Sequence, residues 1–343
     1  MASPDALEHV PPRRRPLDAV LSVRRAVRSF LSEPEHAAHL RAGELYVGVS
    51  GGADSLALAE AAAHVGGRLG VRVCALVVDH QLQAGSSEIA RRAADEALRL
   101  GVHTAKVLAV TVEGPGGPEA AARRARYAAL RDNAAESALV LLGHTLDDQA
   151  ETVLLGLGRG SGPRSLAGMR PFEVPWARPL LDTPRAVTRA ACHELGVHPW
   201  DDPHNTDPRF RRVRLREEVL PLLEDVLAGG VAAALARTAR QLREDCDALD
   251  SIADEVLAGA LDGAGLRVEV LATVPSPVRR RVLRTWLLHG GVRELTDAHL
   301  RSVDELVERW RGQGGVFLPG GVEARRAHGK LVLNRCQPTT PGS

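Results

Sequence analysis

The sequence has few cysteines, and none of them has the spacing of a metal site or a disulfide framework. It holds four in 343 residues, and no two form a C-x-x-C pair. This argues against a zinc ribbon, an iron–sulfur site and a disulfide-stapled fold, and it fits a reducing compartment. We therefore expect a cytoplasmic protein. The four are Cys74, Cys192, Cys246 and Cys336.

Long apolar runs are absent as well. No stretch reaches the roughly 18 residues that a membrane span needs. The first 22 residues also lack the apolar segment of a secretion signal. We expect no membrane partner, and we interpret residues 1–22 as a flexible, basic extension.

An excess of one charge is also missing. The formal net charge is +1, so a nucleic-acid partner would have to be bound by a local basic surface. Lysine is rare, because all but Lys106 and Lys330 of the 44 basic residues are arginine. Alanine and glycine are abundant too, so we attribute the preference for arginine over lysine to the base composition of the genome. With 44% hydrophobic and 25% charged residues, the composition is that of a globular protein of one large or two ordinary domains.

The first part of the sequence alternates between strand-like and helix-like segments. Strand-like runs occupy residues 44–49, 71–79, 104–112 and 138–143, and helix-like segments occupy 54–66, 86–100 and 118–136. This alternation predicts an α/β fold with a doubly wound parallel sheet. Ligands of such sheets bind at the carboxyl ends of the strands, so each strand-to-helix junction is a candidate site.

Beyond these strands the pattern becomes helical. One helix is predicted to begin at Thr183 as N-cap, with Pro184 in its first turn, and to end at Gly196. From residue 228 onward only helix-like segments follow, until the runs of 314–335 predict a closing hairpin. We therefore predict an α/β domain over 23–227 and a small helical domain with a C-terminal β-hairpin over 228–343.

Residues 50–55 read SGGADS between the first strand and the first helix, and no lysine of a Walker loop accompanies them. Gly51 and Gly52 leave room for phosphate oxygens to approach the backbone, and the hydroxyls of Ser50 and Ser55 can donate to them. Asp54 would repel phosphate unless it holds Mg²⁺. An ordinary strand-to-helix turn is the alternative for this stretch taken alone.

The stretch GHTLDDQAET follows the fourth strand and carries three acids at a predicted helix start. Thr145 is positioned to cap the helix. Asp148 and Glu151 share one helical face beside His144, so we predict a site there. For Asp147 we prefer the simpler interpretation that an acid near a helix N-terminus complements the helix dipole.

Five arginines gather near residue 212 with no acid expected to face them. We favour contact with RNA phosphates over a solvated helix face, because the cluster lies between the two predicted domains. They are Arg209, Arg211, Arg212, Arg214 and Arg216. A second basic stretch, VRRRVLRTW, fits RNA contact and a solvated face equally well; it contains Arg279, Arg280, Arg281, Arg284 and Trp286.

In their order and spacing, these stretches resemble the tRNA(Ile)-lysidine synthetases, a branch of the PP-loop ATP-pyrophosphatase enzymes whose signature is S-G-G-x-D-S. The resemblance runs from about residue 44 to 225 and includes GHTLDDQAET, RGSGP and FRRVRLR. The hexamer marks the superfamily, and the other stretches mark the branch. One departure is Val213, where the family usually has asparagine between two arginines.

The resemblance implies a two-step reaction on an isoleucine tRNA with a CAU anticodon. ATP adenylates the C2 oxygen of the first anticodon cytidine, with Mg²⁺ on Asp54, and the ε-amine of L-lysine then displaces AMP. The residues implied in catalysis are Asp54, Arg126, His144, Asp148 and Glu151. Those implied in ATP binding are Ser50, Gly51, Gly52, Ala53, Asp54, Ser55, Asp79 and His80. The five arginines from Arg209 to Arg216 are implied in tRNA binding, and a homodimer is one open option.

Four alternative functions can be compared with this resemblance. A tRNA thiolase of the same superfamily needs a catalytic cysteine pair or an iron–sulfur C-x-x-C, and an amidotransferase-type synthetase needs a glutaminase domain; the sequence has neither. Another PP-loop tRNA-modifying enzyme stays open. A nucleotide-binding sensor without catalysis would explain SGGADS but would leave Asp148, Glu151 and the arginines without a role.

Overall fold

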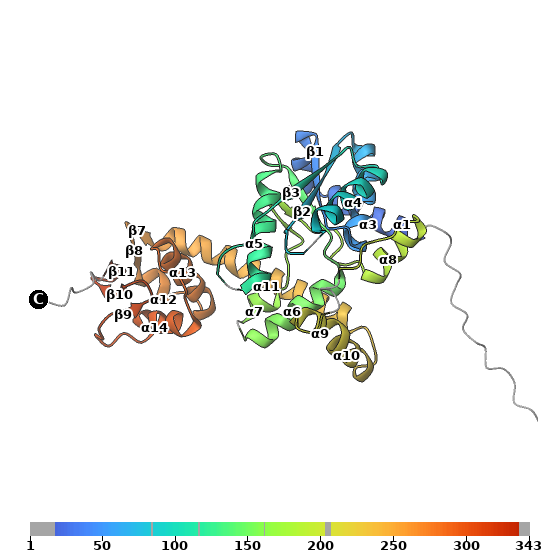
Figure 1. The fold of residues 1–343 in the computed structure, drawn as a ribbon. Coiled ribbons are helices and arrows are strands. Elements are labelled where there is room, and N and C mark those ends of the chain that lie inside the picture. The colour runs from blue at the N-terminus through green and yellow to red at the C-terminus, as the bar shows by residue number, and fades with distance from the viewer. Residues whose placement is uncertain (1–17, 84, 116, 161, 203–206, 336–343) are drawn as a thin grey trace, which may run out of the picture. The chain divides into compact units, whose positions relative to one another are not determined.

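The computed structural model describes residues 18–83, 85–115, 117–160, 162–202 and 207–335. The chain forms two compact units, residues 1–240 and 241–343, and each is described by itself (Figure 1). Helix α11 (Val231–Ala260) runs across their boundary. Residues 1–17 of the predicted extension lie outside the described residues, whereas α1 already begins at Asp18.

The first unit is built around a six-stranded sheet with the order β3-β2-β1-β4-β6-β5. The strands are β1 (Glu44–Val49), β2 (Arg72–Asp79), β3 (Thr104–Ala109), β4 (Leu139–Leu142), β5 (Phe172–Glu173) and β6 (Trp176–Ala177). All neighbours pair in parallel except β5 with β6. The predicted parallel sheet is confirmed, with the ends of the four predicted strands shifted by at most three residues.

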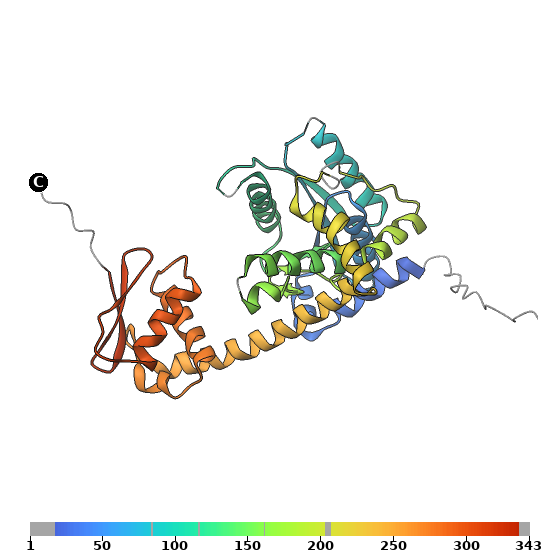
Figure 2. The same ribbon diagram turned by 90° about the horizontal axis from the view of Figure 1, so that it is seen from below.

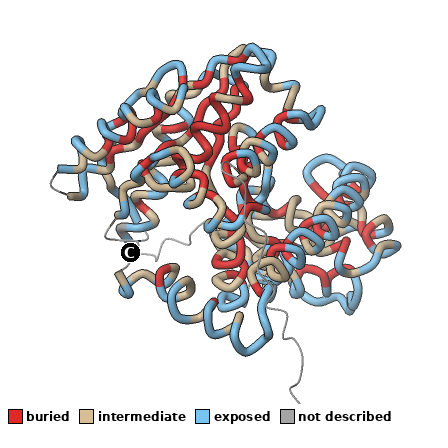
Figure 3. Tube along the Cα trace, turned by 90° about the vertical axis from the view of Figure 1, so that its right-hand side faces the viewer, coloured by how far each residue is buried: buried red, intermediate tan, exposed pale blue. Residues whose placement is uncertain are grey.

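Helices cover both faces of this sheet, as the alternation of side chains along its strands requires. Leu45 and Val47 of β1 pack into the core shared with α1 (Asp18–Leu31), α3 (Ala53–Leu69) and α4 (Ser86–Arg99). Tyr46, between them, points to the opposite face, into the core with α5 (Gly117–Asp132). Figure 3 shows the buried residues following these strands and the helices against them.

The first unit contains further helices. They are α2 (Pro34–Ala37), α6 (Leu146–Arg159), α7 (Pro163–Leu166), α8 (Arg185–Glu194), α9 (Arg211–Arg214) and α10 (Leu220–Val226), with a 3₁₀ turn at Ala38–Ala42 and a π-helical turn at Leu215–Val219. Of these, α8 packs against α1 and α3. The predicted N-cap of α8 is wrong by one residue. Pro184, with extended backbone, is the N-cap instead of Thr183. No single helix in the described ranges is long and apolar enough to cross a membrane. The bent helix pair 211–226 and 231–260 has sufficient length and apolar composition only when the two helices are counted together.

The second unit contains α12 (Val268–Ala272), α13 (Ser276–His289), α14 (Asp297–Glu308) and a five-stranded antiparallel sheet, β7-β8-β11-β10-β9 (Figure 2). Its strands are β7 (Leu261–Asp262), β8 (Gly265–Arg267), β9 (Val316–Leu318), β10 (Val322–Ala327) and β11 (Lys330–Arg335). The predicted hairpin is present as β10 and β11. The expectation of helices alone before it is wrong, because β8 pairs with β11, which lies more than sixty residues further along the chain.

A glycine fixes the contact between α6 and α7, and it gives a first prediction. A Cβ on Gly156 would come within 2.2 Å of the Ser165 carbonyl oxygen, whereas Gly158 on the same helix has open space. We expect Gly156→Ala to destabilise the fold by about 3 kcal/mol, because a backbone atom must move. Gly158→Ala should stabilise it by up to about 1 kcal/mol through helix propensity. Thermal unfolding of both variants measures the difference, and equal midpoints would contradict it.

Candidate active site

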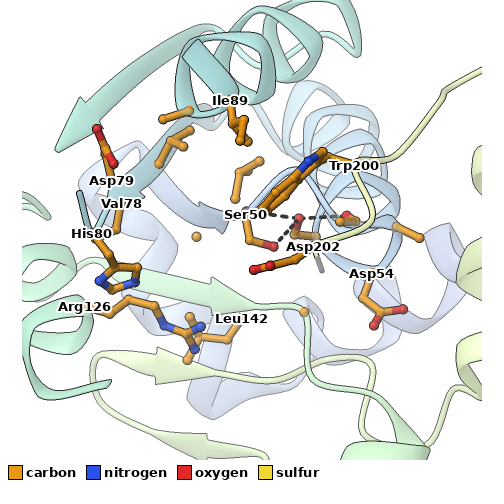
Figure 4. Close-up of a pocket in the computed structure, with 18 of the residues that line it drawn as sticks. Ser50, Asp54, Val78, Asp79, His80, Ile89, Arg126, Leu142, Trp200 and Asp202 are labelled. Carbon is orange, nitrogen blue, oxygen red and sulfur yellow. Dashed lines mark hydrogen bonds between the residues drawn. The ribbon is translucent and has the colours of Figure 1, made fainter. Parts of the chain in front are cut away.

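A cavity of about 700 Å³ opens at the carboxyl ends of β1, β2 and β4 (Figure 4). Its wall includes Ser50 and residues 52–55 of the glycine loop, without Gly51, the end of β2 with Asp79 and His80, and Arg126 of α5. The remaining wall comes from His144 and Asp148 at the start of α6, Arg185 and Arg189 of α8, the segment 200–202, and Arg216 with Glu217. The strand-end location is the one that the sheet topology predicts.

The glycine loop is preformed. Gly51 has a φ of +84°, which a residue with a side chain rarely adopts. Ser55 holds the loop closed, because its Oγ accepts from the Ser50 N–H at 3.1 Å and donates to the Gly52 carbonyl at 2.9 Å. The backbone N–H of Trp200 donates to the Gly51 carbonyl at 3.0 Å. No side chain in the described residues caps α3, so its first N–H groups are left for an anion.

Three carboxylates converge on one guanidinium at the side of the cavity. Arg185 lies 3.3 Å from Asp54 (Nε to Oδ2), 2.6 Å from Asp148 (Nη2 to Oδ1) and 3.5 Å from Glu151 (Nη1 to Oε1). Arg216 approaches from the other side and donates to Glu151 Oε1 at 2.8 Å. Thr188 donates to the second oxygen of Asp54. We call Asp54, Asp148 and Glu151 the acid cluster.

The members of the acid cluster differ in access to the cavity. The Asp148 side chain borders the cavity and is 14% exposed, whereas that of Glu151 is fully buried beneath the two arginines. Burial raises the pKa of Asp54 and of Glu151 above the ordinary values, despite their arginine partners. Burial acts on Asp148 too, but Arg185 and the hydrogen bonds from Thr145 outweigh it and lower the Asp148 pKa. Asp148 is therefore the carboxylate that stays ionised most readily.

Thr145 is the N-cap of α6, as predicted, and it forms a capping box with Asp148. The backbone N–H and the hydroxyl of Thr145 donate to Asp148 Oδ2 at 2.8 and 2.9 Å. The Asp147 carboxylate accepts from the backbone N–H of Arg185 at 2.8 Å and so supports the first turn of α8. Asp147 thus binds a second helix N-terminus, consistent with a structural role.

The opposite wall holds two histidines and an arginine. His80 Nδ1, Arg126 Nε and His144 Nδ1 are buried without a hydrogen-bond partner in the part of the chain that the structure describes. Burial and the Arg126 charge lower the pKa of His144 to about 3 and also lower that of His80. Both imidazoles are neutral at pH 7 and keep hydrogen-bonding capacity for a ligand.

Two of the predicted ATP-binding side chains have internal partners. Asp79 accepts from the Gln81 N–H at 3.0 Å and from the Ser87 hydroxyl at 2.8 Å, which holds the turn between β2 and α4. Ser55 donates its hydroxyl hydrogen within the loop, as described above. Both residues still line the cavity, together with Ser50, Gly52, Ala53, Asp54 and His80.

The expectation that the arginine cluster faces no acid is wrong for three of its members. Arg209 pairs with Asp207 at 2.7 Å, Arg214 with Glu218 at 2.8 Å, and Arg216 with Glu151. Asp207 and Glu218 are each close in sequence to the arginine with which they pair, whereas Glu151 is distant in sequence from Arg216 and is brought to it by the fold. Arg211 and Arg212 have no acid partner among the described residues. Val213, at the usual asparagine position, is buried, and residues 203–206 of this stretch lie outside the described residues.

The second basic stretch is largely paired inside its own unit. Arg279 is buried and contacts both Asp304 and Glu308, and Arg281 contacts Asp250 at 2.8 Å. Trp286 is buried and donates to the Ala264 carbonyl at 3.0 Å. These contacts favour a structural role over RNA contact for Arg279, Arg281 and Trp286.

Arg185, Thr188 and Trp200 are site residues that the sequence alone did not indicate. Arg185 reaches Asp54 across 131 positions and Asp148 across 37. No local pattern marks such a residue, because α8 otherwise has the composition of an ordinary surface helix. Its only signal is its position in the first turn of a helix that follows a strand.

Comparison with known proteins agrees with this geometry. Residues 22–223 match the PP-loop domain family, and residues 266–332 match the TilS substrate binding domain. The chain is 56% identical to the tRNA(Ile)-lysidine synthase of Rhodococcus erythropolis, covering 92% of this chain and 95% of that one. It is 54% identical to the enzyme of the same name from Mycobacterium tuberculosis, covering 92% and 98%.

A solved structure supports the fold. The U34-tRNA thiolase NcsA from Methanococcus maripaludis, described with its [4Fe-4S] cluster, superposes with a TM-score of 0.53 at 18% identity, over 66% of this chain and 80% of that one. That likeness confirms the α/β class and carries no statement about activity. On the sequence matches, this chain belongs to the tRNA(Ile)-lysidine synthase family.

Proposed function

We propose that the protein joins L-lysine to C2 of the first anticodon cytidine in an isoleucine tRNA with a CAU anticodon. ATP is consumed, and AMP and pyrophosphate are released. The observation that carries this proposal is that one cavity is lined by the glycine loop, by Arg126 between the neutral His80 and His144, and by Asp148 of the acid cluster. Phosphate, nucleobase and ammonium each have a chemically matched surface there. ATP and tRNA make the cytoplasm the proposed location.

The first step places ATP with its phosphates at the start of α3. The C2 oxygen of cytidine attacks the α-phosphorus, a P–O bond forms, and the bond to the β-phosphate breaks, releasing pyrophosphate. The free N–H groups of α3 stabilise the phosphate charge. Arg126, with Nε unpartnered, is suited to donate to the cytidine.

Asp54 has the chemistry of a Mg²⁺ ligand in this step. Its oxygens accept from Thr188 and Arg185, and each keeps a lone pair. Mg²⁺ commonly takes one or two carboxylates and completes its shell with water and phosphate oxygens. When bound with ATP, the ion would neutralise charge on the departing pyrophosphate. No group of three ligands that could hold a metal alone is found among the described residues.

In the second step the lysine ammonium loses a proton to water in the open cavity, and the resulting ε-amine attacks C2. The C2–O bond to AMP breaks, and the second nitrogen proton also passes to water. Asp148 is suited to bind the ammonium group, because it lines the cavity and its pKa is lowered. A carboxylate of low pKa is a weak base, so its role is to orient lysine more than to deprotonate it. Glu151 holds Arg216 in place from beneath.

Incubation of the purified protein with ATP, L-lysine and tRNA tests the proposal. Lysidine in the nuclease digest, seen by mass spectrometry, and pyrophosphate release that depends on tRNA are expected. A sensor without catalysis would release no pyrophosphate. Another PP-loop tRNA-modifying enzyme would release pyrophosphate and give a product without lysine.

We also propose that the arginine cluster binds tRNA through Arg211 and Arg212, since the acids beside Arg209, Arg214 and Arg216 already neutralise those residues. The double variant Arg211→Ala, Arg212→Ala should weaken tRNA binding and reduce the log–log salt slope by up to about two, roughly one per lost phosphate contact. Arg214→Ala is the matched control, with a smaller expected change. Filter binding at several salt concentrations measures both variants. A salt slope of the double variant equal to that of wild type would mean that the cluster is a solvated helix face.

A further inference from the structure

Arg185 occupies the place among the acids where a cation would otherwise bind. Its three guanidinium nitrogens each approach a different carboxylate, at 2.6 to 3.5 Å, and its side chain is only 13% exposed. Its backbone N–H binds a fourth acid, Asp147, which fixes where the side chain starts. The guanidinium is therefore held from several directions and is a built-in counter-cation.

The charges of this group leave room for one more positive charge. Asp54, Asp148 and Glu151 contribute three negative charges when ionised, and Arg185 with Arg216 contributes two positive ones, which leaves one negative. Asp147, which binds the Arg185 backbone, and Arg189 on the cavity wall add one charge of each sign and leave this balance unchanged. Hydrogen bonding is also incomplete, because Glu151 Oε2 has no partner in the described residues although Glu151 is fully buried. A single ammonium group balances this charge, whereas a free divalent ion would exceed it.

We propose that Arg185 is a positioning residue that makes the acid cluster selective for one ammonium group and prevents a divalent metal ion from binding there without nucleotide. The identification of that ammonium with lysine rests on the proposed function. Asp54 cannot take a metal ion alone without placing it beside the Arg185 Nε that already binds Oδ2. The phosphates of ATP supply the negative charge that admits the ion.

The test measures metal binding without ATP or tRNA. Wild type, Arg185→Gln and Arg189→Gln are unfolded thermally over a MnCl₂ series. Arg189 is the matched control, because it lies one turn further along α8 and lines the same cavity, yet contacts no acid in the described residues. We expect a saturable rise of the unfolding midpoint for Arg185→Gln alone, on the order of 5 °C at 10 mM.

The Mn²⁺ unfolding series tests the proposal independently of lysidine formation. No rise for Arg185→Gln, or an equal rise for Arg189→Gln, would overturn it. If Arg185→Gln gives no cooperative transition, Arg185→Lys decides, because its single ammonium cannot span three carboxylates and should permit weaker, still saturable Mn²⁺ binding. Lysine kinetics is the second readout: Arg185→Lys should raise the KM for lysine at least tenfold while the KM for ATP changes less. If wild type makes no lysidine, the proposed function is wrong, but the Mn²⁺ series still tests whether Arg185 prevents a divalent ion from binding.

Discussion

Asp54→Ala is expected to reduce tRNA-dependent pyrophosphate release by about 10³-fold, the size of effect seen when a preorganised electrostatic partner of a transition state is removed. The carboxylate stands one residue into α3, beside the phosphate-binding loop, and borders the cavity. Without it, the charge that develops on the leaving pyrophosphate has no protein-held metal ligand beside it. Initial rates of pyrophosphate release at saturating ATP and tRNA measure the loss.

The fold should survive this change. Burial raises the pKa of Asp54, so its ionised form is disfavoured in the folded state and costs stability at pH 7. Asp54→Asn should therefore leave the unfolding midpoint equal or higher while activity falls. Thr188→Val is the matched control, because it removes the hydroxyl that donates to Asp54 and keeps the carboxylate. A turnover of Asp54→Ala within threefold of wild type would remove the role assigned to this residue.

The elements whose signals are local were predicted from the sequence. The strands β1, β2 and β4 have mostly apolar runs, the loop at residues 50–55 joins a strand to a helix, and Thr145 stands at the N-cap of α6. Each of these depends on side chains within one turn or one strand. The two-residue strands β5 and β6 were missed, because they are strands only through pairing with each other and with β4.

The charge pairing of the site could not be predicted in the same way. Spacing alone places Asp148 and Glu151 on one helical face and makes them equivalent. The fold separates them, since Arg216 comes from 65 residues away to cover Glu151 and leaves Asp148 on the cavity wall. The same long-range pairing places Arg216, an expected RNA contact, against Glu151 of the acid cluster, and its contact with tRNA stays a prediction. Sequence thus identified the acids, and tertiary contacts decided which of them borders the cavity.

The second large effect is expected for Asp148→Asn. The amide keeps the size of the side chain and can still accept from the Thr145 N–H, but it loses the charge that binds Arg185 and, by our proposal, lysine. We expect lysine transfer to slow by about 10²-fold, or about 2.7 kcal/mol of transition-state stabilisation, while adenylation falls by less than about tenfold. Rapid-quench trapping of adenylated tRNA and of lysidine measures the two steps separately, and the adenylated species should accumulate.

Stability gives an independent check on the same variant. The folded-state pKa of Asp148 is lowered, so its ionised form stabilises the fold at neutral pH, and that contribution is lost as pH falls from about 4 through the lowered value. Asp148→Asn should therefore unfold at a lower temperature than wild type at pH 7, and the gap should narrow below about pH 4. Asp147→Asn is the matched control, because it removes a charge one residue earlier whose hydrogen-bond partner, among the residues that the structure describes, is the Arg185 backbone N–H. It should change both chemical steps by less than about threefold. If Asp148→Asn slowed adenylation and transfer by one common factor, Asp148 would act on the nucleotide or the cytidine, and lysine would have to bind to another part of the cavity.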